Sequence, residues 1–128
     1  MINTVTPPIG AGLSRERLPG HVLITLRGEL DVASTPALRE RLHAALQDPG
    51  PLVVIDLSQV TFCDASGLAL LVGARRRTEP KGVTLVLAAP SAQMTRMLGV
   101  TGLHGAFTIR RSVAAARLAR AHGRSAAA

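Results

Sequence analysis

The chain has 128 residues and a formal net charge of +7, with 47% of its residues hydrophobic and 18% charged. These values are typical of one compact domain and exclude collagen-like and wholly disordered chains. The longest apolar runs, such as 52–55 and 68–72, fall far short of the ~20 residues that a membrane-spanning helix needs. Residues 1–12 read as a short polar leader rather than a secretory signal, so we expect a cytoplasmic protein with no membrane anchor.

The positive charge is unevenly distributed along the chain. Glu79 is the last acidic residue, and up to Pro80 arginines and acids cancel, so the whole excess lies beyond Pro80. Such a basic end fits an acidic partner or nucleic acid. The only aromatic residues are Phe62 and Phe107, and their apolar, strand-like contexts offer no stacking platform. We therefore expect no specific nucleic-acid binding.

The first predicted elements are a hairpin and a helix. Residues 13–17 and 21–27 are strand-like and flank the turn signal Leu-Pro-Gly at 18–20. The sequence Ser34-Thr35-Pro36 then combines a hydroxyl side chain that can cap a helix with a proline suited to its first position. This helix is predicted to run to about Leu46, since leucines recur every four residues on one side.

The rest of the chain alternates between strands and helices. The apolar run L-V-V-I-D-L at 52–57 predicts a central strand that is covered on both faces, and residues 58–65 are predicted to be a connection. The elements predicted after it are a helix at 67–77, a strand at 83–88, a helix at 92–98, a strand at 107–110 and a helix from 113 to about 121.

This order predicts a small α/β domain with a mixed sheet of four or five strands and about four helices, joined by right-handed crossovers. We expect the domain to span residues 13–122, after the leader at 1–12. Residues 123–128 are expected to form a frayed tail.

Polar residues gather at Asp64-Ala65-Ser66-Gly67, where the chain enters the second predicted helix. Loops beyond the carboxyl ends of parallel strands commonly carry function. Asp64 or Ser66 can simply cap the helix. A phosphoryl group on Ser66 would instead add about −1.5 to −2 charges, which a helix N-terminus tolerates and the neighbouring Asp64 opposes. The residues alone leave both interpretations open.

Two motifs resemble those of STAS-domain anti-sigma factor antagonists. They are G-E-L-D at 28–31 and L-S-Q-V-T-F-C-D-A-S-G-L at 57–68, and the similarity extends from about Val22 to Leu118. The resemblance implies a bacterial partner-switching protein that binds a serine-kinase anti-sigma factor when unphosphorylated and thereby frees a sigma factor. Phosphorylation would break that complex, and a serine phosphatase would restore it.

The resemblance also implies roles for individual residues. Ser66 matches the phosphoacceptor of the D-[SA]-S-G-L motif, and Asp31 matches an acidic position that supports partner contact and phosphorylation. Asp31 alone could equally interact with the N-terminus of the helix that follows it. Ala65 stands where many members carry another serine, which leaves Ser66 as the motif's one hydroxyl. The implied partner-binding residues are Glu29, Asp31, Asp64, Ala65, Ser66, Gly67 and Leu68.

The alternative hypothesis is a constitutive STAS-type scaffold that docks partners without a phosphorylation switch. We expect no catalytic activity, because Ser66 lacks G-x-S-x-G surroundings and the four histidines show no spacing that identifies a base. No histidine or cysteine spacing indicates a metal site, and no motif indicates a cofactor. The one cysteine, Cys63, is expected to be an inert, packed thiol, and the protein is expected to be a monomer or weak dimer.

Overall fold

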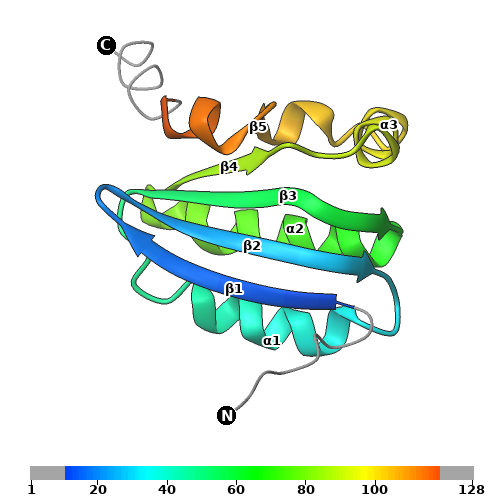
Figure 1. Ribbon diagram of the computed structural model, residues 1–128, viewed down its shortest axis with the longest axis horizontal. Helices are drawn as coiled ribbons and strands as arrows, with labels where there is room; N and C mark the ends of the chain where they lie inside the picture. The colour runs from blue at the N-terminus through cyan, green and yellow to red at the C-terminus, as the bar shows by residue number, and fades with distance from the viewer. Residues whose placement is uncertain (1–10, 119–128) are drawn as a thin grey trace.

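The computed structural model describes residues 11–118, which form a five-stranded mixed sheet with helices against it (Figure 1). The spatial order of the strands is β1-β2-β3-β4-β5, with β1 antiparallel to β2 and the other neighbours parallel. The predicted α/β class and the alternation of strands and helices are confirmed. The elements are β1 (Ala11–Leu18), β2 (His21–Leu30), α1 (Thr35–Ala45), β3 (Leu52–Cys63), α2 (Ala65–Thr78), η1 (Glu79–Lys81), β4 (Thr84–Ala88), α3 (Ala92–Val100), η2 (His104–Ala106) and β5 (Thr108–Arg110).

Residues 113–118 are also helical and form the described part of the predicted last helix. The rest of that helix and the predicted tail at 123–128 lie outside the described residues, as do residues 1–10 of the predicted leader. Residues 11 and 12 belong to β1 rather than to a leader, because Ala11 and Gly12 pair with Gly28 and Arg27 of β2. None of the described helices is both long and apolar enough to cross a membrane.

The main core lies between the sheet and helices α1 and α2, which cover the same face (Figure 1). Ile24, Ile55 and Leu87 of three adjacent strands are fully buried there. They pack with Leu42 of α1 and Leu71 of α2 in one cluster. Burying each such side chain contributes about 1.5–3 kcal/mol.

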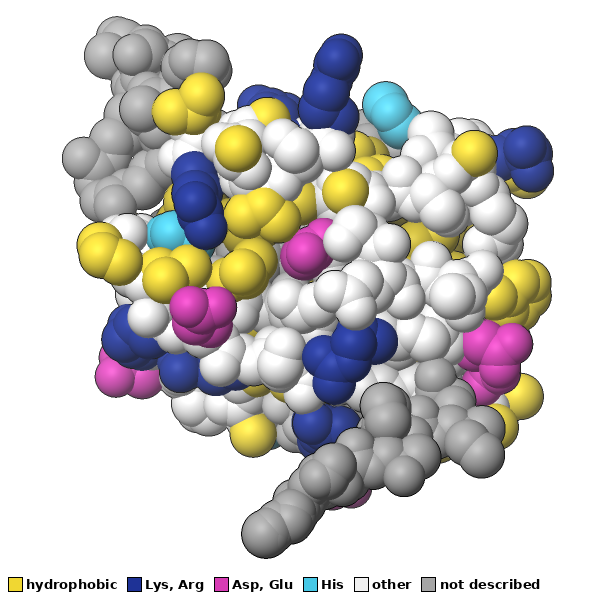
Figure 2. Space-filling model, viewed as in Figure 1, with side chains coloured by type: hydrophobic (Ala, Val, Ile, Leu, Met, Phe, Trp, Pro, Cys, Tyr) yellow, Lys and Arg dark blue, Asp and Glu magenta, His cyan; other side chains and the backbone are white. Residues whose placement is uncertain are grey.

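The opposite face of the sheet is covered mainly at one end. There Val54, Val86 and Ala88 pack against Ala116 of the last helical turn. Figure 2 shows apolar side chains gathered on the left of this face, and mostly uncharged polar side chains or backbone across its middle. This unequal covering means that α1 and α2 provide most of the hydrophobic packing.

Arginine side chains fasten the edge strand β1 to α1. Arg15 Nε donates to the Ala45 carbonyl at 2.9 Å, and Arg41 Nη2 donates to the Leu13 carbonyl at 2.6 Å. Arg17 Nη2 reaches the Asp48 carbonyl beyond the helix at 2.6 Å. Cations near the last carbonyls of a helix also interact favourably with its dipole.

Strand β3 is longer than the sequence predicts, and the predicted connection at 58–65 is wrong. The strand continues to Cys63 and stays paired with β2, from Arg27↔Gln59 to Leu30↔Cys63. Two register shifts interrupt this half of the pairing, between Thr25 and Arg27 and between Gly28 and Glu29. Such irregularities break strict alternation of buried and exposed residues, which explains why S-Q-V-T-F-C did not predict a strand.

Ala89, which follows β4, has a φ of 56°. A side chain carries a steric cost in this left-handed region, so we expect Ala89→Gly to raise the free energy of unfolding by about 1 kcal/mol. The neighbouring Ala88→Gly is the control: Ala88 is fully buried within β4, and glycine there should lower stability by about 1 kcal/mol. Urea unfolding of both variants measures the two changes, and a loss of stability in Ala89→Gly would contradict the prediction.

Candidate functional site

The implied site residues meet at the carboxyl ends of β2 and β3, on the right in Figure 1. Leu30 and Cys63 are paired in the sheet, and the Asp64 N–H donates to the Leu30 carbonyl at 3.0 Å. Asp31 and Asp64 each stand one residue beyond this pair. The parallel pairing therefore brings the two sequence motifs, which are far apart along the chain, to the same edge of the sheet.

Asp64 caps α2, and Ser66 is the second residue of the helix. Asp64 Oδ1 accepts from the Ser66 N–H at 2.7 Å and from the Gly67 N–H at 3.3 Å. Of the two capping interpretations, the structure therefore supports Asp64. Ser66 is half-buried, and its hydroxyl makes no hydrogen bond to another residue within 11–118. That hydroxyl can accept a modification without breaking a hydrogen bond of the described chain.

Gly67 allows the first turn of α2 to pack directly against the ends of β2 and β3. A Cβ atom built at this position would lie 2.5 Å from Cys63 Sγ, 2.7 Å from Leu30 Cβ and 2.9 Å from the Leu30 carbonyl oxygen. The Leu30 Cβ and carbonyl oxygen cannot easily move away, because the backbone of β2 that carries them is closely packed. Glycine at this position is what allows the helix that carries Ser66 to approach the sheet so closely.

Asp31 organises the turn that leads into α1. Its Oδ1 accepts from the N–H groups of Ala33 and Ser34 at 3.1 and 3.0 Å. The helix start predicted from Ser34-Thr35-Pro36 is confirmed, but the predicted hydroxyl cap is not formed: Ser34 occupies the N-cap position and its side chain makes no capping hydrogen bond. The Ser34 hydroxyl instead donates to the Glu29 carbonyl at 2.7 Å and accepts from the Asp31 N–H at 3.1 Å. Asp31 thus has a structural role beside the role implied by the motif.

Gln93 of α3 forms two hydrogen bonds with the backbone of Cys63, the last residue of β3. Its Oε1 accepts from the Cys63 N–H at 3.1 Å, and its Nε2 donates to the Cys63 carbonyl at 2.7 Å. The Cys63 side chain is fully buried. Burial, and to a smaller extent the Asp64 carboxylate, raises the pKa of the Cys63 thiol from 9.0 to about 11. The expected inert, packed thiol agrees with this environment.

A groove of about 350 Å³ runs along the face of α2 that begins at Ala65, the residue before Ser66. Ala65, Leu68 and Val72 line one side, and Thr101 and Leu103 line the other. Leu68 itself is 3% exposed, so it forms the floor of the groove rather than its rim. The lining is mainly apolar and includes one charged residue, Arg76, a composition that suits contact with another protein.

Several large apolar side chains are exposed near these chain segments. Val32, which follows Asp31, is 74% exposed; Phe62, which is paired with Glu29 in the sheet, is 44% exposed; Val100, at the end of α3, is 82% exposed. No sequence motif points to Val32, Val100 or Gln93.

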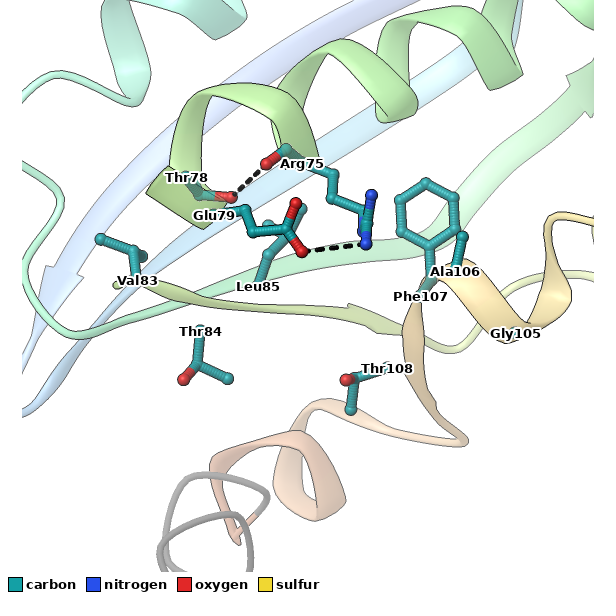
Figure 3. A pocket seen from close by; sticks show the side chains of 10 residues that line it. All are labelled: Arg75, Thr78, Glu79, Val83, Thr84, Leu85, Gly105, Ala106, Phe107 and Thr108. Carbon is teal, nitrogen blue, oxygen red and sulfur yellow. Dashed lines mark hydrogen bonds and ion pairs between the residues drawn. The ribbon is translucent and has the colours of Figure 1, made fainter. Parts of the chain in front are cut away.

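A different cavity, of about 300 Å³, lies at the opposite end of α2 (Figure 3). Arg75 and Glu79 stand at its wall, joined by an ion pair of 2.9 Å. The Thr78 hydroxyl donates to the carbonyls of Ala74 and Arg75 at 3.1 and 3.2 Å. The side chains of Arg75, Thr78 and Glu79 thus make their hydrogen bonds within the protein.

Comparison with known proteins agrees with this geometry. A family model described as the STAS domain matches residues 13–116. The chain belongs to the STAS domain family. An anti-sigma-B factor antagonist of Listeria monocytogenes is 33% identical over 89 residues, which cover 70% of this chain and 78% of the relative. The predicted family resemblance is therefore confirmed.

Solved structures of STAS domain proteins share the fold. An anti-sigma factor antagonist from Mycobacterium paratuberculosis superimposes with a TM-score of 0.79 at 26% sequence identity. The aligned region covers 90% of this chain and 97% of the Mycobacterium chain. The phosphorylated form of the Bacillus cell fate determinant SpoIIAA superimposes with a TM-score of 0.63 at 25% sequence identity. The aligned region covers 82% of this chain and 96% of the SpoIIAA chain.

The close packing of α2 against the strand ends of this STAS domain can be tested with two glycines of the same helix. Gly67→Ala should lower the free energy of unfolding by about 1–3 kcal/mol, because the added methyl overpacks the contact with Leu30 and Cys63. Gly73→Ala is the matched control: nothing lies within 4 Å of its Cβ position, and alanine should stabilise the helix by up to about 1 kcal/mol. Denaturant unfolding measures both, and equal effects would contradict the proposed role of Gly67.

The buried Cys63 thiol should make stability fall at alkaline pH. The thiol ionises near its ordinary pKa of 9.0 in the unfolded chain and only near about 11 in the folded protein. The folded state therefore holds more protons between these values, and the free energy of unfolding decreases as pH rises through this window. Cys63→Ala should lack this component, so subtracting the unfolding curves of the two proteins isolates it. A difference that is flat from pH 8 to pH 11 would refute the assignment.

Proposed function

We propose that this protein is an anti-sigma factor antagonist switched by phosphorylation of Ser66. In this proposal the unphosphorylated protein binds a serine-kinase anti-sigma factor and thereby releases the sigma factor that the kinase held. A serine phosphatase removes the phosphate and restores binding. We place this cycle in the cytoplasm, because it requires ATP and a partner of the transcription machinery.

The observation that carries the proposal is the position of the Ser66 hydroxyl. It lies half-buried on the first turn of α2, without a hydrogen bond to the rest of the described chain, and follows Ala65, which lines a mainly apolar groove. The anti-sigma-B factor antagonist relative supports the partner class. The phosphorylated form of SpoIIAA, which has the same fold, supports a covalent switch.

The chemistry of the switch is phosphoryl transfer from ATP. A bond forms between Ser66 Oγ and the γ-phosphorus while the bond from that phosphorus to the ADP oxygen breaks, and the hydroxyl proton is released. The kinase supplies ATP and its metal ion. This chain supplies an accessible acceptor on a rigid helix and the surrounding docking surface.

The added charge explains why phosphorylation would break the complex. A phosphoserine carries about −1.5 to −2 charges near neutral pH. The Ser66 and Gly67 N–H groups that would otherwise attract it already bind the Asp64 carboxylate. The phosphate would therefore add repulsion to Asp64 and place a strongly hydrated anion on the first turn of α2, next to Ala65, which disfavours a docked protein.

The partner-binding residues are proposed to act in two ways. Ser66, Ala65 and the side chains of Glu29 and Asp31 lie at least partly exposed and can contact the kinase directly. Gly67, Leu68 and Asp64 shape that surface from beneath: Gly67 and Leu68 are buried, and Asp64 holds the first turn of the helix. Substitutions in the second group should change the surface through its shape.

The test begins with incubation of the protein with ATP, Mg²⁺ and the serine-kinase anti-sigma factors of the same genome, followed by mass spectrometry. We expect one phosphate on Ser66, and none on Ser66→Ala. Binding of the same kinases should persist with Ser66→Ala and weaken by about tenfold or more with Ser66→Asp, which corresponds to about 1.4 kcal/mol.

Ser58→Asp serves as the control for charge alone, because Ser58 is exposed on β3 outside the helix. It should bind the kinases like the unchanged protein. Equal affinities of Ser66→Ala and Ser66→Asp, with no phosphate on Ser66, would reject the switch in favour of a constitutive scaffold.

A further inference from the structure

A second groove, independent of Ser66, lies at the β5 edge of the sheet and has a volume of about 530 Å³. Its walls come from the turn after β4, from α3, from β5 and the residue that follows it, and from the last helical turn. The residues that matter for its chemistry are Pro90, Thr95, Ile109, Arg110, Arg111 and Ala115. We call it the arginine groove.

The arginine groove belongs to the basic part of the chain. No acidic residue follows Glu79 in the sequence. Among residues 11–118 the only ion pair is Arg75–Glu79, so neither Arg110 nor Arg111 is paired with a carboxylate of the described chain. Figure 2 shows dark blue side chains projecting from the upper edge of the molecule, the side on which β5 and α3 lie in Figure 1.

The nearest acidic residue in the sheet register does not neutralise the groove. Asp56 pairs with Ala88, which pairs with Arg110, so Asp56 stands two strands away from that arginine. Its Oδ1 accepts from the Ser58 N–H at 2.9 Å. The two arginines of the groove are therefore available to a negatively charged group from outside.

The backbone around the groove is held in place. The Ala89 N–H donates to the Arg110 carbonyl at 2.8 Å, and Arg110 Nη1 donates to the Ile109 carbonyl at 2.9 Å. The second bond orients the guanidinium and also occupies a backbone acceptor of the edge strand. The edge is thus a poor template for an added strand, and recognition here depends on side chains.

We propose that the arginine groove binds an acidic segment of a protein partner. Carboxylates of that segment pair with Arg110 and Arg111, and an apolar side chain between them packs against Pro90, Ile109 and Ala115. Guanidinium groups suit this role because they bind carboxylates through two parallel hydrogen bonds. A protein segment fits better than nucleic acid, because neither Phe62 nor Phe107 lines the groove to stack on a base.

The probe for this proposal is a fluorescein-labelled peptide of repeated Glu-Leu-Asp-Glu, and its neutral counterpart of repeated Gln-Leu-Asn-Gln. Fluorescence anisotropy at physiological ionic strength should show binding of the acidic peptide only. The double variant Arg110→Gln/Arg111→Gln should bind it about tenfold more weakly or worse, since it loses charge-assisted hydrogen bonds. Arg111→Gln alone should show part of this loss, and circular dichroism checks that both variants fold.

The matched control is Arg76→Gln/Arg77→Gln, which removes the same charge from the end of α2. This variant should bind the acidic peptide within about twofold of the unchanged protein, because screening limits the reach of distant exposed charges to about 8 Å at physiological salt. Equal weakening by both double variants would show general attraction to a basic protein and overturn the proposal.

Two other results would also overturn the proposal. One is the absence of binding by the unchanged protein. The other is tighter binding of a labelled DNA duplex that the Arg110→Gln/Arg111→Gln variant loses, because the groove would then be a nucleic-acid surface. Since Ser66 is unchanged in every variant, failure here leaves the phosphorylation switch untouched.

Discussion

The site depends on the parallel pairing of β2 with β3 through its irregular second half. The pairing has two register shifts but continues to Leu30 and Cys63. There it brings Asp31 and Asp64 to one edge of the sheet. The strand ends at this edge are the surface against which the first turn of α2 packs. If β3 ended at Leu57, as its apolar run predicts, the helix would begin from a loop and Ser66 would have no fixed position.

Packing around this edge uses backbone contacts more than side-chain charge. Gly67 approaches the Leu30 backbone, Gln93 binds both backbone groups of Cys63, and Ser34 binds the Glu29 carbonyl. These contacts satisfy strand ends that would otherwise leave polar groups unpaired. They also explain why acidic and hydroxyl residues can gather here while the hydrophobic core lies directly beneath them.

Sequence patterns predicted the order of strands and helices because that order follows from local periodicity. The run 52–57, the leucines of α1 and the junction at 64–67 each had a signal within a short window. The continuation of β3 had none, because its polar residues lie on exposed positions and its pairing is irregular. The Gln93 hydrogen bonds join residues 30 positions apart, and glutamine carries no local signal for such a contact. The Ser34 hydroxyl has a local signal for capping, but it bonds Glu29 and Asp31 just before the helix instead.

The close packing of α2 at Gly67 also affects the free energy with which a partner protein would bind this surface. A partner that meets a loop must order that loop, and the lost conformational entropy reduces affinity. Here the Ser66 hydroxyl stands on a helical turn that is already packed against two strands and capped by a carboxylate. Little backbone freedom remains to be lost on encounter, so association at this surface loses less conformational entropy than association through a loop would.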